Sequence, residues 1–204
     1  MSDEIQFILS GKSPVKHGTI IQTIISYLEA GQGPSEMVER DKHFKKEETK
    51  RLKDYIITNK LVIYNINFDN YVSEGAEQKV YLKDGSSVLK LNDAIYYLSW
   101  IDYFHNLLLH NYFFPDTAYK LLGFTEENDV LYAVVEQNFV KANQKTDLQL
   151  VKEFMVANDF QNTRNNDYMN NKLGVILEDL HDENVLTQDG ILFFIDTVFY
   201  VLKK

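Results

Sequence analysis

The chain has 204 residues, 45% of them hydrophobic, so it can bury the core of one globular unit or of two small lobes. It contains no Cys, which excludes a disulfide framework, a thiolate zinc site and a Cys nucleophile. Its net charge of −9 argues against nucleic-acid binding through a positive field of the whole protein. The sequence has no long apolar run and no signal-peptide pattern, so we expect a cytoplasmic protein that does not bind membranes.

Residues 1–67 are predicted to form a helical N-terminal extension. One helix is expected over 19–30 and a longer one over 35–59, because Gly and Pro residues interrupt the pattern between them. The second helix contains a run, 40–53, with seven Lys or Arg against three Asp or Glu. That run is typical of a solvated face of mixed charge, and the alternative is a surface for a partner or for nucleic acid. We expect the extension to pack on the rest of the chain and cover apolar surface.

Three short strands are predicted over 71–91, with Gly75 near the first turn and Asp84-Gly85 in the second. Asp-Gly is a strong signal for a tight turn between strands. Lys90 lies on the third strand among apolar neighbours, which is unusual for a residue that faces solvent.

A helix is predicted over 94–110, because Asn92 and Asp93 are suitable caps at its start and Phe114-Pro115 follows it as a stop. The next predicted elements are two strands and a helix, at 119–124, 130–135 and 147–157.

An Asn-rich polar stretch, 162–171, is predicted to be a loop, which could act as a lid or contact a substrate. Arg164 is its one Arg. That residue could contact a phosphate, or it could be an ordinary loop Arg.

The most informative motif lies between Asp179 and Asp196. Asp179 and Asn184 are separated by four residues, and a predicted hairpin with a turn at Asp189-Gly190 leads to Asp196. A loop followed by a two-stranded hairpin would bring Asp179, Asn184 and Asp196 to one edge. Phosphoryl transfer requires such a set, with one carboxylate at the acceptor hydroxyl and an Asn and a second carboxylate on the metal ions.

This motif resembles the catalytic loop and metal-binding Asp of the protein kinase-like superfamily. Its Asp-Leu-His-x-x-Asn-Val-Leu pattern is also similar to that of the aminoglycoside and choline phosphotransferases. The wider combination is similar to the kinase-like domain found in bacterial polyvalent proteins of phages and conjugative elements. The segments that carry this wider resemblance are 74–78, 88–93, 162–167 and 177–184.

The resemblance extends over about residues 68–198 and implies an α+β fold. That fold would be a compact, C-terminally truncated protein kinase-like fold with a helical N-terminal extension. It implies an antiparallel-sheet N-lobe at 68–140 and a small C-lobe with the catalytic-loop hairpin at 141–204. Only a few residues follow Asp196, so we expect the helices that seat a peptide in a full protein kinase to be absent.

The resemblance also implies ATP and Mg²⁺ as cofactors, with Mn²⁺ as a substitute, and a role for each site residue. Lys90 would bind the α and β phosphates, although its aliphatic stem could instead follow apolar surface and leave the charge in water. The loop at Gly75 would cover the phosphates, and a hinge at 136–140, which includes Gln137, would contact the adenine. Asp179 would orient the acceptor hydroxyl, and Asn184 and Asp196 would bind the metal. Catalytic roles are therefore implied for Lys90, Asp179 and Asn184.

Acidic residues surround the predicted catalytic loop. They suit a divalent metal, although a solvated acidic turn is the alternative. These residues are Glu178, Asp179, Asp182, Glu183 and Asp196. His181, in the same loop, could contact a hydroxyl or serve as a structural hydrogen bonder.

The chain also departs from the kinase pattern. The loop at Gly75 has one Gly where three are expected, and Thr197-Val198 follows Asp196 in place of Phe-Gly. No Glu occurs in the predicted helix over 94–110, so Asp102 is the nearest acid that could pair with Lys90, or it is an exposed helix carboxylate.

Two functions from different classes follow from these features. The first is an ATP- and Mg²⁺-dependent phosphotransferase that binds a nucleotide and an acceptor, either a protein or a small molecule. The second is a pseudokinase that binds a nucleotide or a partner without transfer. A purely structural partner in a mobile-element system is a third and weaker interpretation.

Overall fold

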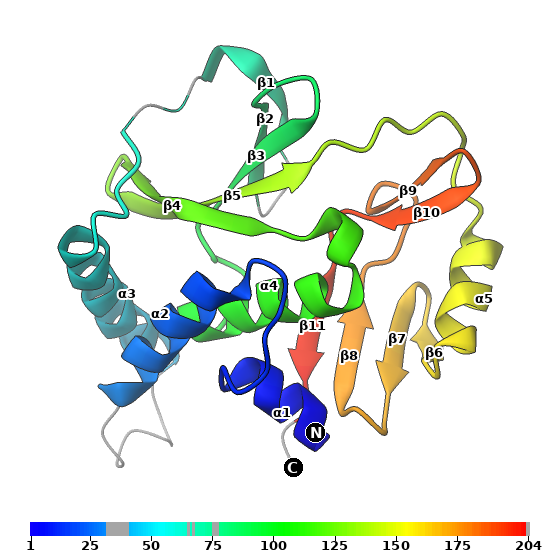
Figure 1. Cartoon of the computed structure of the whole chain (residues 1–204), viewed down its shortest axis with the longest axis horizontal. Coiled ribbons are helices and arrows are strands. Elements are labelled where there is room, and N and C mark those ends of the chain that lie inside the picture. Colours follow the sequence, from blue (N-terminus) through cyan, green and yellow to red (C-terminus); the bar gives the residue numbers. More distant parts are fainter. Residues whose placement is uncertain (32–40, 65, 67, 75–77, 203–204) are drawn as a thin grey trace. The chain divides into compact units, whose positions relative to one another are not determined.

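A computed structural model describes the chain except for residues 32–40, 65, 67, 75–77 and 203–204 (Figure 1). The chain divides into two compact units. The first, which we call the five-stranded unit, consists of residues 17–104 and 119–139. The second, which we call the hairpin unit, consists of residues 1–16, 105–118 and 140–204. Within the described residues, no helix is long and apolar enough to cross a membrane.

The five-stranded unit contains one antiparallel sheet with the strand order β1-β2-β3-β5-β4. Its strands are β1 (Tyr71–Glu74), β2 (Gln78–Leu82), β3 (Ser87–Asn92), β4 (Lys120–Glu127) and β5 (Val130–Asn138). The three strands predicted over 71–91 and the turn at Asp84-Gly85 are confirmed. The last two strands are longer than predicted, because Asn128 and Asp129 both adopt left-handed backbone angles and turn the chain within two residues.

Two helices precede this sheet in the chain, α2 (Gly18–Ala30) and α3 (Asp41–Thr58). Both lie within the ranges predicted from the sequence or within one residue of them, and the predicted start of the second at 35 falls outside the described residues. Both belong to the five-stranded unit. The Tyr27 and Tyr55 rings pack at 4.8 Å between centroids, and the Arg51 guanidinium donates to the Tyr27 carbonyl at 2.9 Å. The basic run is therefore partly engaged within the unit.

The segment after α3 runs beside β4. The Phe124 N–H donates to the Leu61 carbonyl at 2.9 Å, and the Ile63 N–H donates to the Phe124 carbonyl at 2.7 Å. Gly123 makes this approach feasible, because a Cβ atom there would lie 2.3 Å from the Leu61 carbonyl oxygen.

Helix α4 (Trp100–Phe113) begins later than predicted. The Asn92 carboxamide accepts from the Ala94 N–H at 2.7 Å, and Ala94 has a left-handed φ of 56°. Asn92 and Asp93 therefore stabilise turns and do not cap the helix, so the prediction of a helix over 94–110 is wrong at its N-terminus.

Helix α3 supplies the contacts that set the start of α4. The buried Glu48 carboxylate accepts from the backbone N–H of Trp100 at 2.5 Å and of Ile101 at 3.4 Å. The Lys45 ammonium donates to the carbonyls of Ala94 and Tyr97. A carboxylate at a helix N-terminus satisfies N–H groups that have no partner within the helix.

The hairpin unit contains a four-stranded antiparallel sheet with the order β11-β8-β7-β6 and a separate hairpin of β9 and β10 (Figure 1). Its strands are β6 (Gln161–Arg164), β7 (Asp167–Asn170), β8 (Val175–Glu178), β9 (Val185–Gln188), β10 (Ile191–Phe194) and β11 (Val198–Val201). Its own helices are α1 (Asp3–Leu9), which was not predicted, and α5 (Leu148–Ala157), which was. Short 3-10 turns lie at η1 (Phe68–Asn70) and, in the hairpin unit, at η2 (Pro115–Thr117).

The Asn-rich stretch 162–171 is not a loop. It contains most of the β6–β7 hairpin, whose turn includes the left-handed Asn165. The hairpin at Asp189-Gly190 is confirmed, with left-handed φ angles at both residues. An α+β fold with N-terminal helices and antiparallel sheets is thus confirmed.

We predict that Glu48→Gln removes a pH-dependent loss of stability. Burial raises the pKa of Glu48 well above its ordinary value, to about 7. The folded protein therefore binds this proton more tightly, and the associated stability is present below the unfolded pKa and lost as pH rises through 7. The free energy of unfolding of the variant, relative to wild type, should increase by up to about 3 kcal/mol over this interval.

Urea unfolding at about pH 5 and about pH 8 measures this difference. Glu47→Gln, at an exposed neighbouring position on the same helix, is the control and should show no such change. A difference for Glu48→Gln that stays constant with pH would contradict the prediction.

Candidate active site

Asp179 follows directly after β8 and has a left-handed φ of 69°. Its backbone N–H donates to the Asp167 carboxylate at 3.1 Å, and Asp167 is the first residue of the neighbouring strand β7. A left-handed conformation is unfavourable for most non-glycine residues, so the surrounding contacts must hold it. Asp167 provides one of them.

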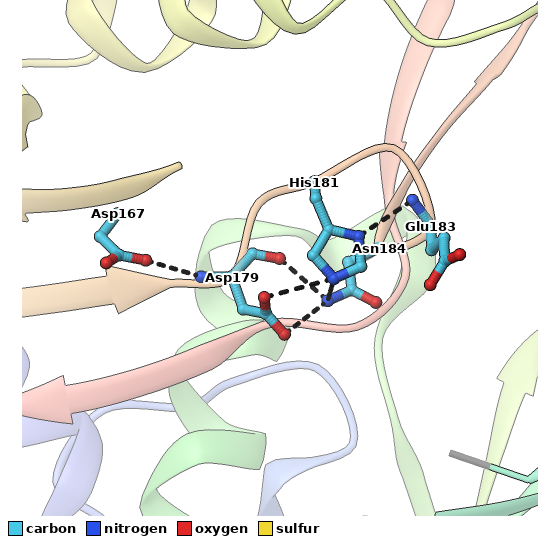
Figure 2. Close-up of polar contacts among 5 residues, drawn as sticks. All are labelled: Asp167, Asp179, His181, Glu183 and Asn184. Carbon is cyan, nitrogen blue, oxygen red and sulfur yellow. Dashed lines mark hydrogen bonds and ion pairs between the residues drawn. The ribbon is translucent and has the colours of Figure 1, made fainter. Parts of the chain in front are cut away.

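Asn184 links the two ends of the catalytic loop. Its side-chain amide donates to the Asp179 carbonyl at 2.9 Å and to the Asp179 carboxylate Oδ2 at 3.0 Å (Figure 2). Both amide hydrogens are used in this way, which also identifies the orientation of the carboxamide. The Asn184 Oδ1 atom therefore remains as an acceptor-only group beside Asp179.

His181 supplies a donor to the other oxygen of the same carboxylate. Its Nδ1 accepts from the Glu183 N–H at 3.2 Å, so in the neutral ring the proton lies on Nε2. That Nε2 atom is 3.2 Å from Asp179 Oδ1 (Figure 2). The Asp179 carboxylate is oriented by one donor on each oxygen, while its side chain remains 56% exposed. Such a group can accept a proton from an approaching hydroxyl.

Asp196 reaches this loop through the hairpin β9–β10. The Asn184 carbonyl accepts from the N–H of Ile195 at 2.9 Å and of Asp196 at 3.3 Å. The structure thus brings Asp179, Asn184 and Asp196 together, as their spacing predicts. Their chemical roles stay predictions.

Negative charge is concentrated at the start of the loop. Burial raises the pKa of Glu178, and the charges of Asp167 and Asp179 raise it further. Within the described residues, no group of three or more His, Asp or Glu side chains could by itself hold a metal ion. The five acidic residues therefore do not form a protein-only metal centre. The oxygen atoms of Asn184 and Asp196 suit Mg²⁺, which commonly takes few protein ligands and completes its shell with phosphate and water.

Lys90 and Gln137 belong to the five-stranded unit. Lys90 is only 4% exposed, and its ammonium lies 5.3 Å from the centre of the Tyr119 ring. The alternative in which its charge extends into water is therefore wrong. Gln137 is buried and lies inside β5, so the predicted hinge over 136–140 begins within a strand. Gly75 lies outside the described residues.

Asp102 serves at the N-terminus of α4. Its carboxylate accepts from the Ser99 hydroxyl at 2.8 Å, and its N–H donates to the same hydroxyl at 3.0 Å. This arrangement is related to a capping box. The sequence suggests two roles for Asp102, an exposed helix carboxylate or a replacement for the helix Glu. Neither includes this capping role.

The prediction of a loop over 162–171 does not identify Asp167 as a residue of the site, because it overlooks the strand that Asp167 begins. Its signal was the Asn165-Asn166 pair, since Asn is one of the residues that tolerates the left-handed angles of a two-residue hairpin turn.

Residues 45–203 match the family described as a serine/threonine/tyrosine kinase found in polyvalent proteins. The chain belongs to this family. The match confirms the resemblance and begins within α3, earlier than the predicted start near residue 68. No curated protein and no solved structure gives a significant match.

We predict that Asn184→Asp destabilises the protein more than Asn184→Ala does. Both changes remove the donors to Asp179, but only the first places a second carboxylate near Asp179 Oδ2, which lies 3.0 Å from the amide in the wild type. The extra loss in free energy of unfolding should be about 1 kcal/mol in low salt. Urea unfolding measures the difference in free energy of unfolding between the two variants. About 0.5 M NaCl should reduce this difference, because salt screens exposed charges. Equal stability of the two variants in low salt would be inconsistent with this geometry.

Proposed function

We propose that this kinase-family protein is an ATP- and Mg²⁺-dependent phosphotransferase whose acceptor is a protein or small-molecule hydroxyl. The observation that carries the proposal is the orientation of Asp179 by Asn184 and His181, with Asp196 joined to the same Asn184. A phosphotransferase needs a carboxylate at the acceptor hydroxyl next to oxygen ligands for metal. These groups occur together in the hairpin unit.

In this proposal Asp179 accepts the hydroxyl proton as the acceptor oxygen bonds to the γ-phosphorus and the bond to ADP breaks. The donors from Asn184 and His181 keep the carboxylate in one orientation through this step. Asn184 Oδ1 and the Asp196 carboxylate would hold Mg²⁺, which neutralises phosphate charge when bound.

Lys90 would bind the α and β phosphates of the same nucleotide. Its position on β3 supports this assignment, because the family match includes this strand and kinases carry their phosphate-binding Lys on the third strand of the sheet. Because the family match covers residues 45–203, we also assign the five-stranded sheet to a kinase-like N-lobe and the catalytic hairpin to a small C-lobe. Gln137 and the loop at Gly75 would contact the adenine and the phosphates.

A pseudokinase is the second candidate. The observation that favours it is the capping role of Asp102, because α4 contains no Glu that could pair with Lys90 in its place. A kinase-like domain whose helix supplies no Glu to the strand lysine would still bind nucleotide and yet support transfer poorly.

We predict that ATP with Mg²⁺ stabilises the wild-type protein. At about 100 times its dissociation constant the ligand should add about 2.7 kcal/mol to the free energy of unfolding. Asp196→Asn should lose the Mg²⁺-dependent part of the shift, because it removes the charged metal ligand. Thermal unfolding with ATP alone, MgCl₂ alone and both together measures this. No shift with any nucleotide would overturn the phosphotransferase proposal and the nucleotide-binding form of the pseudokinase.

We predict that Asp179→Asn retains nucleotide binding and lowers phosphoryl transfer to a protein or small-molecule acceptor by about 100-fold or more. Transfer from radiolabelled ATP to a panel of acceptors, with ATP hydrolysis as the fallback readout, measures the rate. Asp182→Asn, at an exposed position in the same loop, is the matched control. Wild-type binding with no transfer or hydrolysis above the Asp179→Asn level would instead support the pseudokinase.

A further inference from the structure

A buried polar network lies under the segment that contains Asp196. His110, on α4, is fully buried, and its Nδ1 lies 2.7 Å from the hydroxyl of Thr197. Its Nε2 lies 3.0 Å from the carbonyl of Thr117. All of these residues belong to the hairpin unit.

The proton positions in this network follow from the chemistry of the partners. The Thr117 carbonyl can only accept, so His110 Nε2 carries a proton. In the neutral ring Nδ1 is then an acceptor, and the Thr197 hydroxyl donates to it. The Thr117 hydroxyl donates to the Phe194 carbonyl at 2.5 Å. The chain of hydrogen bonds thus begins at the Thr197 hydroxyl and ends at the Phe194 carbonyl, on the two sides of Asp196.

A second side chain of α4 extends the same contact. The Asn106 carboxamide accepts from the Phe199 N–H at 2.8 Å, and Asn106 lies one helical turn before His110. Figure 1 shows α4 beside β11, the strand that begins at Val198, shortly after Asp196. Phe194 also stacks on Phe114, with 4.1 Å between ring centres. The segment 194–199 is therefore held by hydrogen bonds at several points.

We propose that His110, Thr117 and Thr197 are positioning residues that fix Asp196 for metal binding. This inference rests on the proposed function. The residues do not contact the metal or the substrate. They act by holding the Phe194 carbonyl before Asp196 and the Thr197 side chain after it, while the Asn184 carbonyl accepts from the Asp196 N–H. A carboxylate on a fixed backbone binds Mg²⁺ with less loss of conformational freedom than one on a mobile segment.

The test compares Thr197→Val with Thr197→Ser. Valine has nearly the same shape and lacks the hydroxyl, whereas serine keeps it. Thr49→Val is the control, because Thr49 also makes a side-chain hydrogen bond, to the Trp100 indole at 2.9 Å, but lies in the five-stranded unit. Hydrogen exchange of the amides in 194–199, followed by mass spectrometry without ligand, reports directly on the segment.

We expect Thr197→Val to speed exchange in 194–199 by about fivefold or more, the factor that corresponds to one hydrogen bond of about 1 kcal/mol. The Mg²⁺ concentration for half of the ATP-dependent thermal shift should rise by a similar factor. Thr197→Ser should stay near wild type in both measurements. Thr49→Val should change overall stability without either local effect. If Thr197→Val does not fold, Thr117→Val and Thr117→Ser form an equivalent pair.

The possible results distinguish a failure of the hydrogen-bond network from a failure of the proposed function. Exchange in 194–199 that is the same in Thr197→Val and Thr197→Ser would overturn the network. Faster exchange with an unchanged Mg²⁺ requirement would overturn the positioning of Asp196 for metal. No ATP and Mg²⁺ response in wild type would reject the proposed phosphotransferase and with it the metal role, while the exchange measurement would still decide whether the network holds the segment.

Discussion

Asn184 is the residue on which the candidate active site depends. Its side-chain amide binds both the carbonyl and the carboxylate of Asp179, and its backbone carbonyl accepts from Ile195 and Asp196. One residue therefore joins the end of β8 to the end of β10. A change in the direction of its carboxamide would release Asp179, and a shift of its backbone would release Asp196. The two carboxylates cannot be placed independently of each other.

The predictions that the structure confirms concern interactions between residues close in sequence. Asp189-Gly190 turns the chain through left-handed backbone angles, and Asp84 stabilises its own turn by accepting from the Ser86 N–H at 2.7 Å. Asp147 caps α5 by accepting from the Gln149 N–H at 2.8 Å. Such features depend on only a few neighbouring residues. Distant packing cannot easily override them, so the sequence alone indicates them well.

The start of α4 could not be predicted in the same way, because it depends on contacts across about 50 residues of sequence. Asn92 and Asp93 are good caps by residue type. Lys45 of α3, however, donates to the carbonyls of Ala94 and Tyr97, and Glu48 accepts the first N–H groups of the helix further along. The candidate site shows the same division. The spacing of Asp179, Asn184 and Asp196 indicates their proximity. No local pattern points to His110, and the Asn165-Asn166 signal indicates a turn before Asp167 but not the contact of Asp167 with Asp179.

The polar interior of α4 follows from what surrounds Asp196. The backbone between β10 and β11 is not in a strand, and its Ile195 and Asp196 N–H groups donate to the Asn184 carbonyl. From one face of α4, His110 accepts from the Thr197 hydroxyl, and Asn106 accepts from the Phe199 N–H at the start of β11. Buried polar side chains that are fully hydrogen-bonded add little net stability, since they exchange one set of hydrogen bonds for another. They do favour one arrangement strongly, because any other leaves a buried group without a partner. A short segment that must present a carboxylate in one position gains more from this selectivity than from additional apolar contact.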